Sequence, residues 1–75
     1  MLDRLREVVA GTAAAPPELD GYLAKVRDRP YTVTDADVEA LKAAGVSEDT
    51  IFEQTVATAI GEGLRRFDAA QRAIA

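Results

Sequence analysis

The sequence contains no cysteine, no histidine and no tryptophan, and it has a single methionine. The absence of cysteine excludes a disulfide framework, a thiolate metal site and thiol redox chemistry. The absence of histidine removes the usual general acid or base near neutral pH and the commonest metal ligand. Any chemistry would therefore have to come from carboxylates, tyrosines, lysines, arginines and hydroxyl groups.

The chain has enough apolar residues to fold, but they can form only a small hydrophobic core. Leu, Ile, Val and Phe make up 18 of 75 residues, which is above the range of disordered chains. Alanine supplies 15 of the other apolar positions. A chain of this length hides only about 60% of the surface that its unfolded form exposes. We therefore expect well-packed helices or contacts with other copies of the chain to supply the missing stability.

The charge is negative and unevenly distributed. The net charge is −4, which disfavours nonspecific binding to nucleic acids and to anionic membranes. Residues 30–56 carry six acids against Lys42 alone, whereas residues 57–75 carry three arginines against two acids. Most of these charges suit a solvated surface and helix ends, but they also fit a dipolar subunit whose acidic part meets the basic tail of a neighbour.

No apolar run approaches the roughly 18–20 residues that a membrane span requires. The N-terminal segment is charged and lacks the apolar core of a signal peptide. We expect a cytoplasmic protein with no membrane partner.

The first half of the chain predicts two helices. The apolar spacing from Leu2 to Val9 predicts a short amphipathic helix that ends at Gly11. Pro16-Pro17 suits the start of a second helix, and Arg29-Pro30 ends it. The apolar face of this second helix comprises Leu19, Tyr22, Leu23 and Val26. The segment 31–33 is expected to be an extended connector.

Two further helix starts carry clear capping signals. Thr34 is an N-cap, and Asp37 three residues later completes a capping-box pattern. Gly45 is expected to end this helix in the left-handed conformation, and Ser47 is expected to cap the next one. No proline follows, so a single helix is predicted over about 48–73, with a length of about 39 Å. That exceeds the roughly 30 Å diameter of a compact chain of this size.

The long helix is the predicted interaction element. Gly61 and Gly63 each cost about 1 kcal/mol relative to alanine inside a helix. They indicate a close crossing with another helix, within the chain or between subunits; the alternative is that they only kink or weaken the helix. The predicted residues of the oligomer interface and helix packing are Phe52, Val56, Ala59, Ile60, Gly63, Leu64 and Phe67.

Two motifs have alternative interpretations. The Ala44–Ile51 segment resembles the turn of a helix-turn-helix domain. The recognition helix of such a domain would, however, begin near Glu48 and present Glu48, Asp49 and Glu53 to the DNA phosphates. We therefore expect no nucleic-acid partner. The carboxylates near Thr34 fit capping and the helix dipole better than metal ligation. We expect no catalytic residues, no metal site and no cofactor.

The segment from Tyr31 to Glu53, YTVTDADVEALKAAGVSEDTIFE, resembles the C-terminal helical hairpin of the alkylhydroperoxidase D / carboxymuconolactone decarboxylase superfamily. There a T-D-x-D-V-x-x-L-x-x-A-G-x-S-x-x-x-I-F pattern leads into a long helix with small residues and a late basic pair. The resemblance covers roughly residues 19–74, and residues 1–18 have no counterpart. We therefore expect a single domain over 1–75. It consists of a short N-terminal helix with a linker (1–18) and a superfamily-like helical region (19–75).

The resemblance implies an all-α fold of antiparallel helices that assembles into a ring, typically a trimer or hexamer. It does not transfer the catalysis. The peroxidase branch uses Cys-x-x-Cys with a histidine and a glutamate, and the decarboxylase branch uses a histidine and a glutamate. No position of this chain matches either motif.

The sequence therefore leaves two hypotheses open. In the first, this is a non-catalytic, small antiparallel helical bundle or hairpin that homo-oligomerises as a dimer, trimer or hexamer and acts as a scaffold, accessory subunit or binding module. In the second, it is a superfamily-like enzyme or a binder of an unidentified small molecule, with a pocket between subunits. The polar groups of that pocket would be Tyr31, Glu53 and Arg66.

Overall fold

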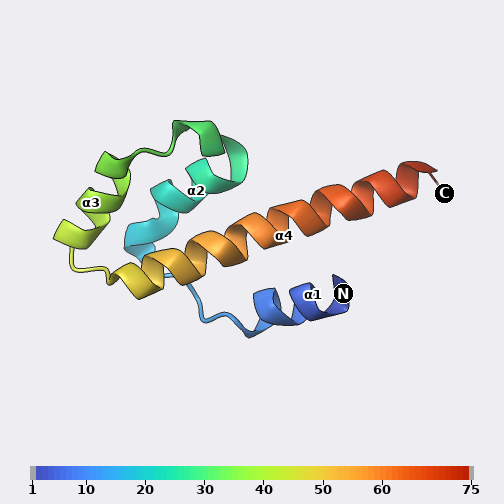
Figure 1. Ribbon diagram of the computed structural model, residues 1–75, viewed down its shortest axis with the longest axis horizontal. Helices are drawn as coiled ribbons and strands as arrows, with labels where there is room; N and C mark the ends of the chain where they lie inside the picture. The colour runs from blue at the N-terminus through green and yellow to red at the C-terminus, as the bar shows by residue number, and fades with distance from the viewer. Residues whose placement is uncertain (1, 75) are drawn as a thin grey trace.

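The fold is described by a computed structural model for residues 2–74 (Figure 1). These residues form four α-helices and two 3-10 turns, and none of them lies in a strand. The all-α class predicted from the sequence is therefore confirmed. The elements in chain order are α1 (Leu2–Gly11), η1 (Pro17–Leu19), α2 (Asp20–Asp28), η2 (Pro30–Thr32), α3 (Asp35–Ala43) and α4 (Glu48–Ile74).

Helix α4 determines the shape of the molecule. It contains 27 residues and is about 40 Å long at 1.5 Å per residue. The described chain measures 47 × 25 × 18 Å, and its radius of gyration is 13.7 Å, against about 11 Å for a compact chain of this length. The C-terminal end of α4 projects beyond the other helices (Figure 1). The predicted overhang of the long helix is thus confirmed.

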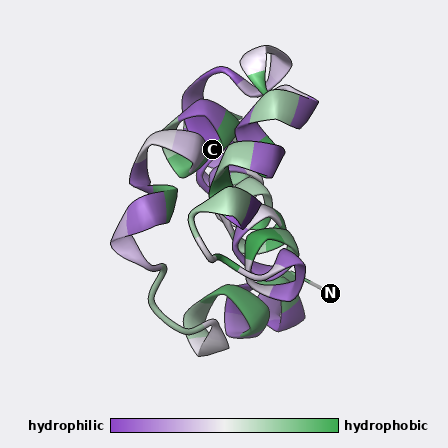
Figure 2. Cartoon of the chain, turned by 90° about the vertical axis from the view of Figure 1, so that its left-hand side faces the viewer, coloured by the Kyte–Doolittle hydropathy of each residue, from purple (hydrophilic) through white to green (hydrophobic). Residues whose placement is uncertain are grey.

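The core lies where α2, α3 and the first turns of α4 meet. Its buried members are Leu19, Tyr22, Leu41 and Ile51, and Leu23 and Val26 pack against them. The apolar face predicted for the second helix is therefore confirmed. Figure 2 shows polar and apolar residues side by side around the same helices, as expected for amphipathic elements with one buried face.

The one phenol in the core has its polar atom satisfied. The hydroxyl of Tyr22 lies 2.8 Å from Oγ1 of Thr55. The Thr55 hydroxyl donates to the carbonyl oxygen of Ile51 at 2.6 Å, so the Tyr22 hydroxyl donates to Thr55. This bond connects α2 to α4 at the edge of the core.

The predicted capping box at the start of α3 is confirmed. The Thr34 hydroxyl accepts from the backbone N–H of Asp37 at 3.3 Å, and the Asp37 carboxylate accepts from the backbone N–H of Thr34 at 2.9 Å. Lys25 on α2 donates to the same carboxylate at 3.0 Å. The Thr34 backbone bond, followed by the Lys25 bond, lowers the pKa of Asp37. One carboxylate therefore both caps α3 and ties it to α2.

The turn between α3 and α4 also follows the sequence. Gly45 has a φ of +93°, the left-handed conformation that favours glycine. The N–H of Val46 donates to the Leu41 carbonyl and the N–H of Gly45 donates to the Lys42 carbonyl, which is the Schellman pattern. Ser47 then caps α4 by accepting from the Thr50 N–H at 3.1 Å.

The prediction of an extended connector at 31–33 is wrong for most of that segment. Pro30–Thr32 is a 3-10 turn, and only Val33 has extended backbone angles. Pro30 has a φ fixed near the helical value and occupies the first turn, where no N–H is needed. The Thr32 N–H and hydroxyl both donate to the Arg29 carbonyl, at 2.9 Å and 2.7 Å. These two bonds satisfy the end of α2 and close the turn.

Helix α1 lies along α4 in the opposite direction (Figure 1). Three contacts show the direction, because residues later in α1 and its linker meet residues earlier in α4. Arg6 forms a bidentate pair with Asp68, the Val9 side chain faces Gly61, and the Ala13 carbonyl accepts from Gln54.

The capping box generates a stability prediction. Replacing Thr34 with valine keeps the shape of the side chain but removes the oxygen that accepts from the Asp37 N–H. We expect a loss of about 1 kcal/mol in the free energy of unfolding, measured by urea denaturation. Thr34→Ser keeps the hydroxyl and should lose much less. Equal losses in the two variants would show that the cap does not contribute.

Candidate functional site

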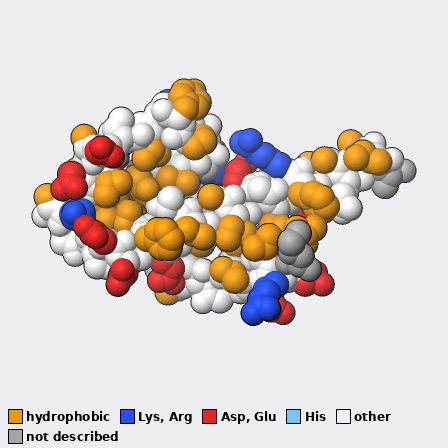
Figure 3. Space-filling model, in the orientation of Figure 1, with side chains coloured by type: hydrophobic (Ala, Val, Ile, Leu, Met, Phe, Trp, Pro, Cys, Tyr) orange, Lys and Arg blue, Asp and Glu red, His pale blue; other side chains and the backbone are white. Residues whose placement is uncertain are grey.

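An apolar stripe runs along the solvent-exposed side of α4. Its large members are Phe52, Val56, Phe67 and Ile74, with exposed fractions of 72, 36, 41 and 86%. Exposed small residues lie between them. We call this surface the α4 stripe, and it comprises Phe52, Val56, Ala59, Gly63, Phe67, Ala70 and Ile74. Space filling shows apolar side chains following the course of α4 to its projecting end (Figure 3).

The opposite side of α4 packs inside the chain. Its buried residues are Ile51, Gln54, Ala57 and Leu64. Leu64, which the sequence placed in the candidate interface, is only 7% exposed and belongs to this inner side. Ile60 is half-buried at the margin of the stripe. The remaining five residues proposed from the sequence, Phe52, Val56, Ala59, Gly63 and Phe67, all lie on the exposed stripe.

The two glycines of α4 have different environments. A Cβ added to Gly61 would lie 3.8 Å from Cγ1 of Val9, which is ordinary van der Waals contact with α1. A Cβ added to Gly63 would meet no neighbouring atom of the described chain within 4 Å. Within residues 2–74, therefore, no other helix packs closely against Gly63. The surface of α4 at this glycine is open to another molecule.

The sequence reasoning left Ala70 and Ile74 out of the candidate interface. Both are exposed, and they continue the stripe to the end of α4. The signal was present in the sequence, since 70 and 74 follow Phe67 at the helical steps of three and four residues. Beyond Phe67, Ile74 is the one large apolar residue of the sequence, and the other apolar positions are alanines.

A second feature is an open groove of about 490 Å³ between α1 and α4. The residues lining it are Val9, Thr12, Ala13, Arg27, Gln54, Ala57, Thr58, Gly61, Glu62 and Arg65. Gln54 lies at its base, is 7% exposed, and donates from Nε2 to the Ala13 carbonyl at 2.7 Å. The sequence reasoning missed this glutamine, which holds the α1 linker against α4.

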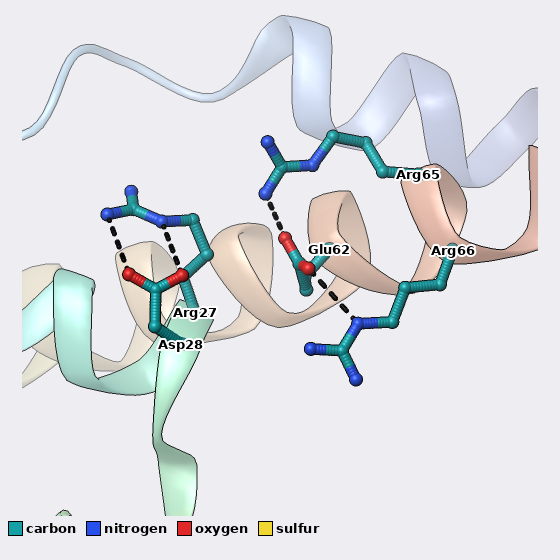
Figure 4. A network of polar contacts seen from close by, with 5 residues as sticks. All are labelled: Arg27, Asp28, Glu62, Arg65 and Arg66. Carbon is teal, nitrogen blue, oxygen red and sulfur yellow. Dashed lines mark hydrogen bonds and ion pairs between the residues drawn. The ribbon is translucent and has the colours of Figure 1, made fainter. Parts of the chain in front are cut away.

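Each charged residue that lines the groove has an ion-pair partner in or beside it. Figure 4 shows the Glu62 carboxylate accepting from Arg65 and from Arg66, the latter through Nε at 3.1 Å. At the end of α2, Arg27 pairs with the adjacent Asp28 at 3.3 Å. The hydrogen bonds from Arg65 and then Arg66 lower the pKa of Glu62, so this carboxylate is ionised at neutral pH.

The shifted pKa values move away from neutrality. Hydrogen bonds from basic side chains lower the pKa of Glu48 and Asp68, as they do for Glu62, while those of Arg6 and Lys42 are raised by their acidic partners. A general acid or base works best with a pKa near the working pH. None of these shifted groups is adjusted for proton transfer near pH 7.

The polar residues proposed for a ligand pocket lie on separate parts of the chain. Tyr31 is 84% exposed on η2, and Glu53 is exposed near the start of α4. Arg66 is thirteen residues further along the same helix, about 20 Å away. One copy of the chain does not bring the three side chains together, and none of them lines the groove.

The acidic side chains gather at the end of the molecule that holds α3 and the start of α4 (Figure 3). Lys42 pairs there with Glu48 at 2.7 Å and with Glu39 at 3.4 Å. Across residues 2–74, no group of three or more acidic side chains is arranged to hold a metal ion. None of the helices over the same residues is long and apolar enough to span a bilayer.

The buried glutamine generates a prediction about α1. Gln54→Ala would leave the Ala13 carbonyl without its donor and the base of the groove unfilled. We expect the free energy of unfolding to fall by about 1–3 kcal/mol and hydrogen exchange in α1 and its linker to accelerate. Gln71→Ala is the matched control, because Gln71 is an exposed glutamine of the same helix. Unchanged exchange in α1 of the Gln54 variant would contradict this role.

The ion pair between Arg6 and Asp68 generates a pH prediction. Arg6 lowers the pKa of Asp68 in the folded chain, chiefly by hydrogen bonding. The stabilisation is therefore complete above the unfolded-state pKa of about 3.9 and disappears as the pH falls through the folded-state value. We expect the amide NMR shifts of α1 to report its release from α4 below about pH 4.

Asp68→Asn is the control for this titration. It removes the ionisable group, so α1 should be weakly held at every pH and should show no release step from this pair. Identical pH profiles in the natural chain and the variant would rule out Asp68 as the group responsible.

Comparison with known proteins identifies no relative of this chain. No family model matches the chain, and neither a curated protein nor a solved structure matches it. The resemblance to the alkylhydroperoxidase D / carboxymuconolactone decarboxylase superfamily, over roughly residues 19–74, thus rests on the sequence pattern alone.

Proposed function

We propose that this is a non-catalytic helical protein that self-associates through the α4 stripe and serves as a scaffold, accessory subunit or binding module. The observation that carries the proposal is the continuous exposed apolar surface along α4. Phe52 and Ile74, near its two ends, are 72 and 86% exposed. Contiguous apolar surface of this kind marks interaction sites in stable proteins.

The energetics favour covering this surface. Burying one Val, Ile or Phe side chain completely contributes about 1.5–3 kcal/mol. The stripe has four such side chains, and the described chain buries six apolar residues of its own, Leu19, Tyr22, Leu41, Ile51, Ala57 and Leu64. Association would therefore add a substantial apolar contact to the small core of a single copy.

The chemistry of the polar groups supports a non-catalytic role. The chain has no cysteine or histidine, which the resembling superfamily uses in catalysis. The Glu62 carboxylate in the groove is held ionised by two arginines, so it is a poor proton donor at neutral pH. The acidic end around α3 would repel phosphates, which supports a partner other than nucleic acid.

The superfamily resemblance agrees with this proposal in its assembly. Members of that superfamily build oligomers from antiparallel helices, and this chain has an all-α fold with one long helix. We propose that it kept such a scaffold without the redox centre. A dimer, a trimer and a hexamer all remain compatible with one exposed stripe per copy.

The test is the native mass of a stripe variant and a matched control. Sedimentation equilibrium at micromolar concentration should give a mass above 8.0 kDa for the natural chain. Phe52→Asp places a charge in the stripe and should shift the equilibrium toward the single chain by at least about tenfold. Tyr31→Asp makes a similar change at an aromatic residue that is 84% exposed and lies outside α4. This control should associate as the natural chain does.

Two results would contradict the proposal. One is a natural chain that sediments at 8.0 kDa throughout the concentration range. The other is an equal loss of association in the Phe52 and Tyr31 variants, which would place the contact elsewhere or show a general charge effect.

A further inference from the structure

The spacing of the α4 stripe is the same when it is counted from either end. Successive members from Phe52 to Ile74 are separated by four, three, four, four, three and four residues. Gly63 is the central member, eleven residues from Phe52 and eleven from Ile74. An antiparallel copy of the same helix therefore presents its apolar residues at the same heights.

We infer that two copies of the chain pair through antiparallel α4 helices, with a two-fold axis that passes beside Gly63 of each copy. This inference rests on the proposed self-association and specifies its partner and direction. In an isologous contact of this kind, each residue meets the one at the same distance on the other side of the axis. The pairs are Phe52 with Ile74, Val56 with Ala70, Ala59 with Phe67, and Gly63 with Gly63.

The sizes of the side chains are complementary in the two pairs next to the axis. Val56 meets Ala70 and Phe67 meets Ala59, so a large side chain faces a small one on both sides of the axis. Such alternation lets facing layers interdigitate without voids. At the axis itself, Gly63 has no Cβ, and a Cβ placed there would meet no atom packed against α4 within 4 Å in the described chain, which leaves room for a second backbone. This gives a function to a glycine that costs about 1 kcal/mol in an isolated helix.

The charges favour the same direction. The first part of α4, 48–60, carries Glu48, Asp49 and Glu53 and no base. The second part, 61–74, carries three arginines against Glu62 and Asp68. Antiparallel pairing places the acidic part of each helix alongside the basic part of the other. It also places the positive end of each helix dipole beside the negative end of the other.

Parallel pairing would lose both advantages. Phe52 would face Phe52, and Gly63 would still face Gly63, but Ala59 and Ala70 would face alanines and leave gaps. The three acids at the start of one α4 would lie beside the same three acids of the other. Like charges placed together at an interface oppose binding.

Single cysteines test the direction, because the natural chain contains none. Val56→Cys and Ala70→Cys chains are mixed in a glutathione redox buffer, and the disulfides are identified by mass. Antiparallel pairing places positions 56 and 70 opposite each other. It separates position 56 from its own copy by fourteen residues, about 21 Å along the helices, which is too far for a disulfide.

We expect the mixed disulfide to exceed either self-disulfide by at least about tenfold. Tyr31→Cys, mixed with Ala70→Cys, is the control for random encounter, because Tyr31 is exposed and lies outside α4. It should give only the statistical yield of disulfides. The native mass of each variant is measured separately with the cysteines kept reduced, so that a mass above one chain reports noncovalent association.

The remaining outcomes separate the two proposals. Predominant self-disulfides of both α4 variants, with a mass above the single chain, would overturn the antiparallel direction but leave association through the stripe in place. Cross-linking at the level of the Tyr31 control, with a mass above 8.0 kDa, would place the contact outside the stripe and overturn both. A mass of 8.0 kDa would remove self-association itself.

Discussion

The structure depends on one mismatch between α4 and the rest of the chain. Helix α4 is longer than the other helices, and they cover only part of its apolar surface. Forty-seven residues precede it, and they form helices of nine or ten residues. These short helices cover one side of α4 and leave its C-terminal turns projecting (Figure 1). The core and the α1–α4 groove lie on the covered side of α4, and the stripe lies on its exposed side.

The part of α4 that faces α1 carries small residues, which allow close packing. Ala57 and Gly61 let α1 approach, and the bond between Gln54 and the Ala13 carbonyl satisfies the linker where it crosses α4. Both phenylalanines lie on the outer side. Burying these two rings against a second helix would add an apolar contact that the described part of the chain does not supply.

Two of the paired carboxylates connect helices, and a third is paired within α4. Asp37 caps α3 and binds Lys25 of α2, Asp68 of α4 holds Arg6 of α1, and Glu62 pairs with two arginines of its own helix. Hydrogen bonds lower the pKa of each of these carboxylates, chiefly from the Thr34 backbone at Asp37 and from arginine side chains at Asp68 and Glu62. An interaction protein requires only such fixed charges, whereas an acid–base catalyst requires a group that changes its protonation near neutral pH.

The sequence by itself determined the helices and their ends, because caps, prolines and Gly45 act through neighbouring backbone groups. It also determined that α4 outgrows a compact chain. Only the tertiary structure decided which side of α4 is buried, since Phe52, Leu64 and Phe67 share helical spacing and differ only in the neighbours that reach them. Leu64 turns inward, the phenylalanines turn outward, and Gln54 is buried because the α1 linker offers its carbonyl there.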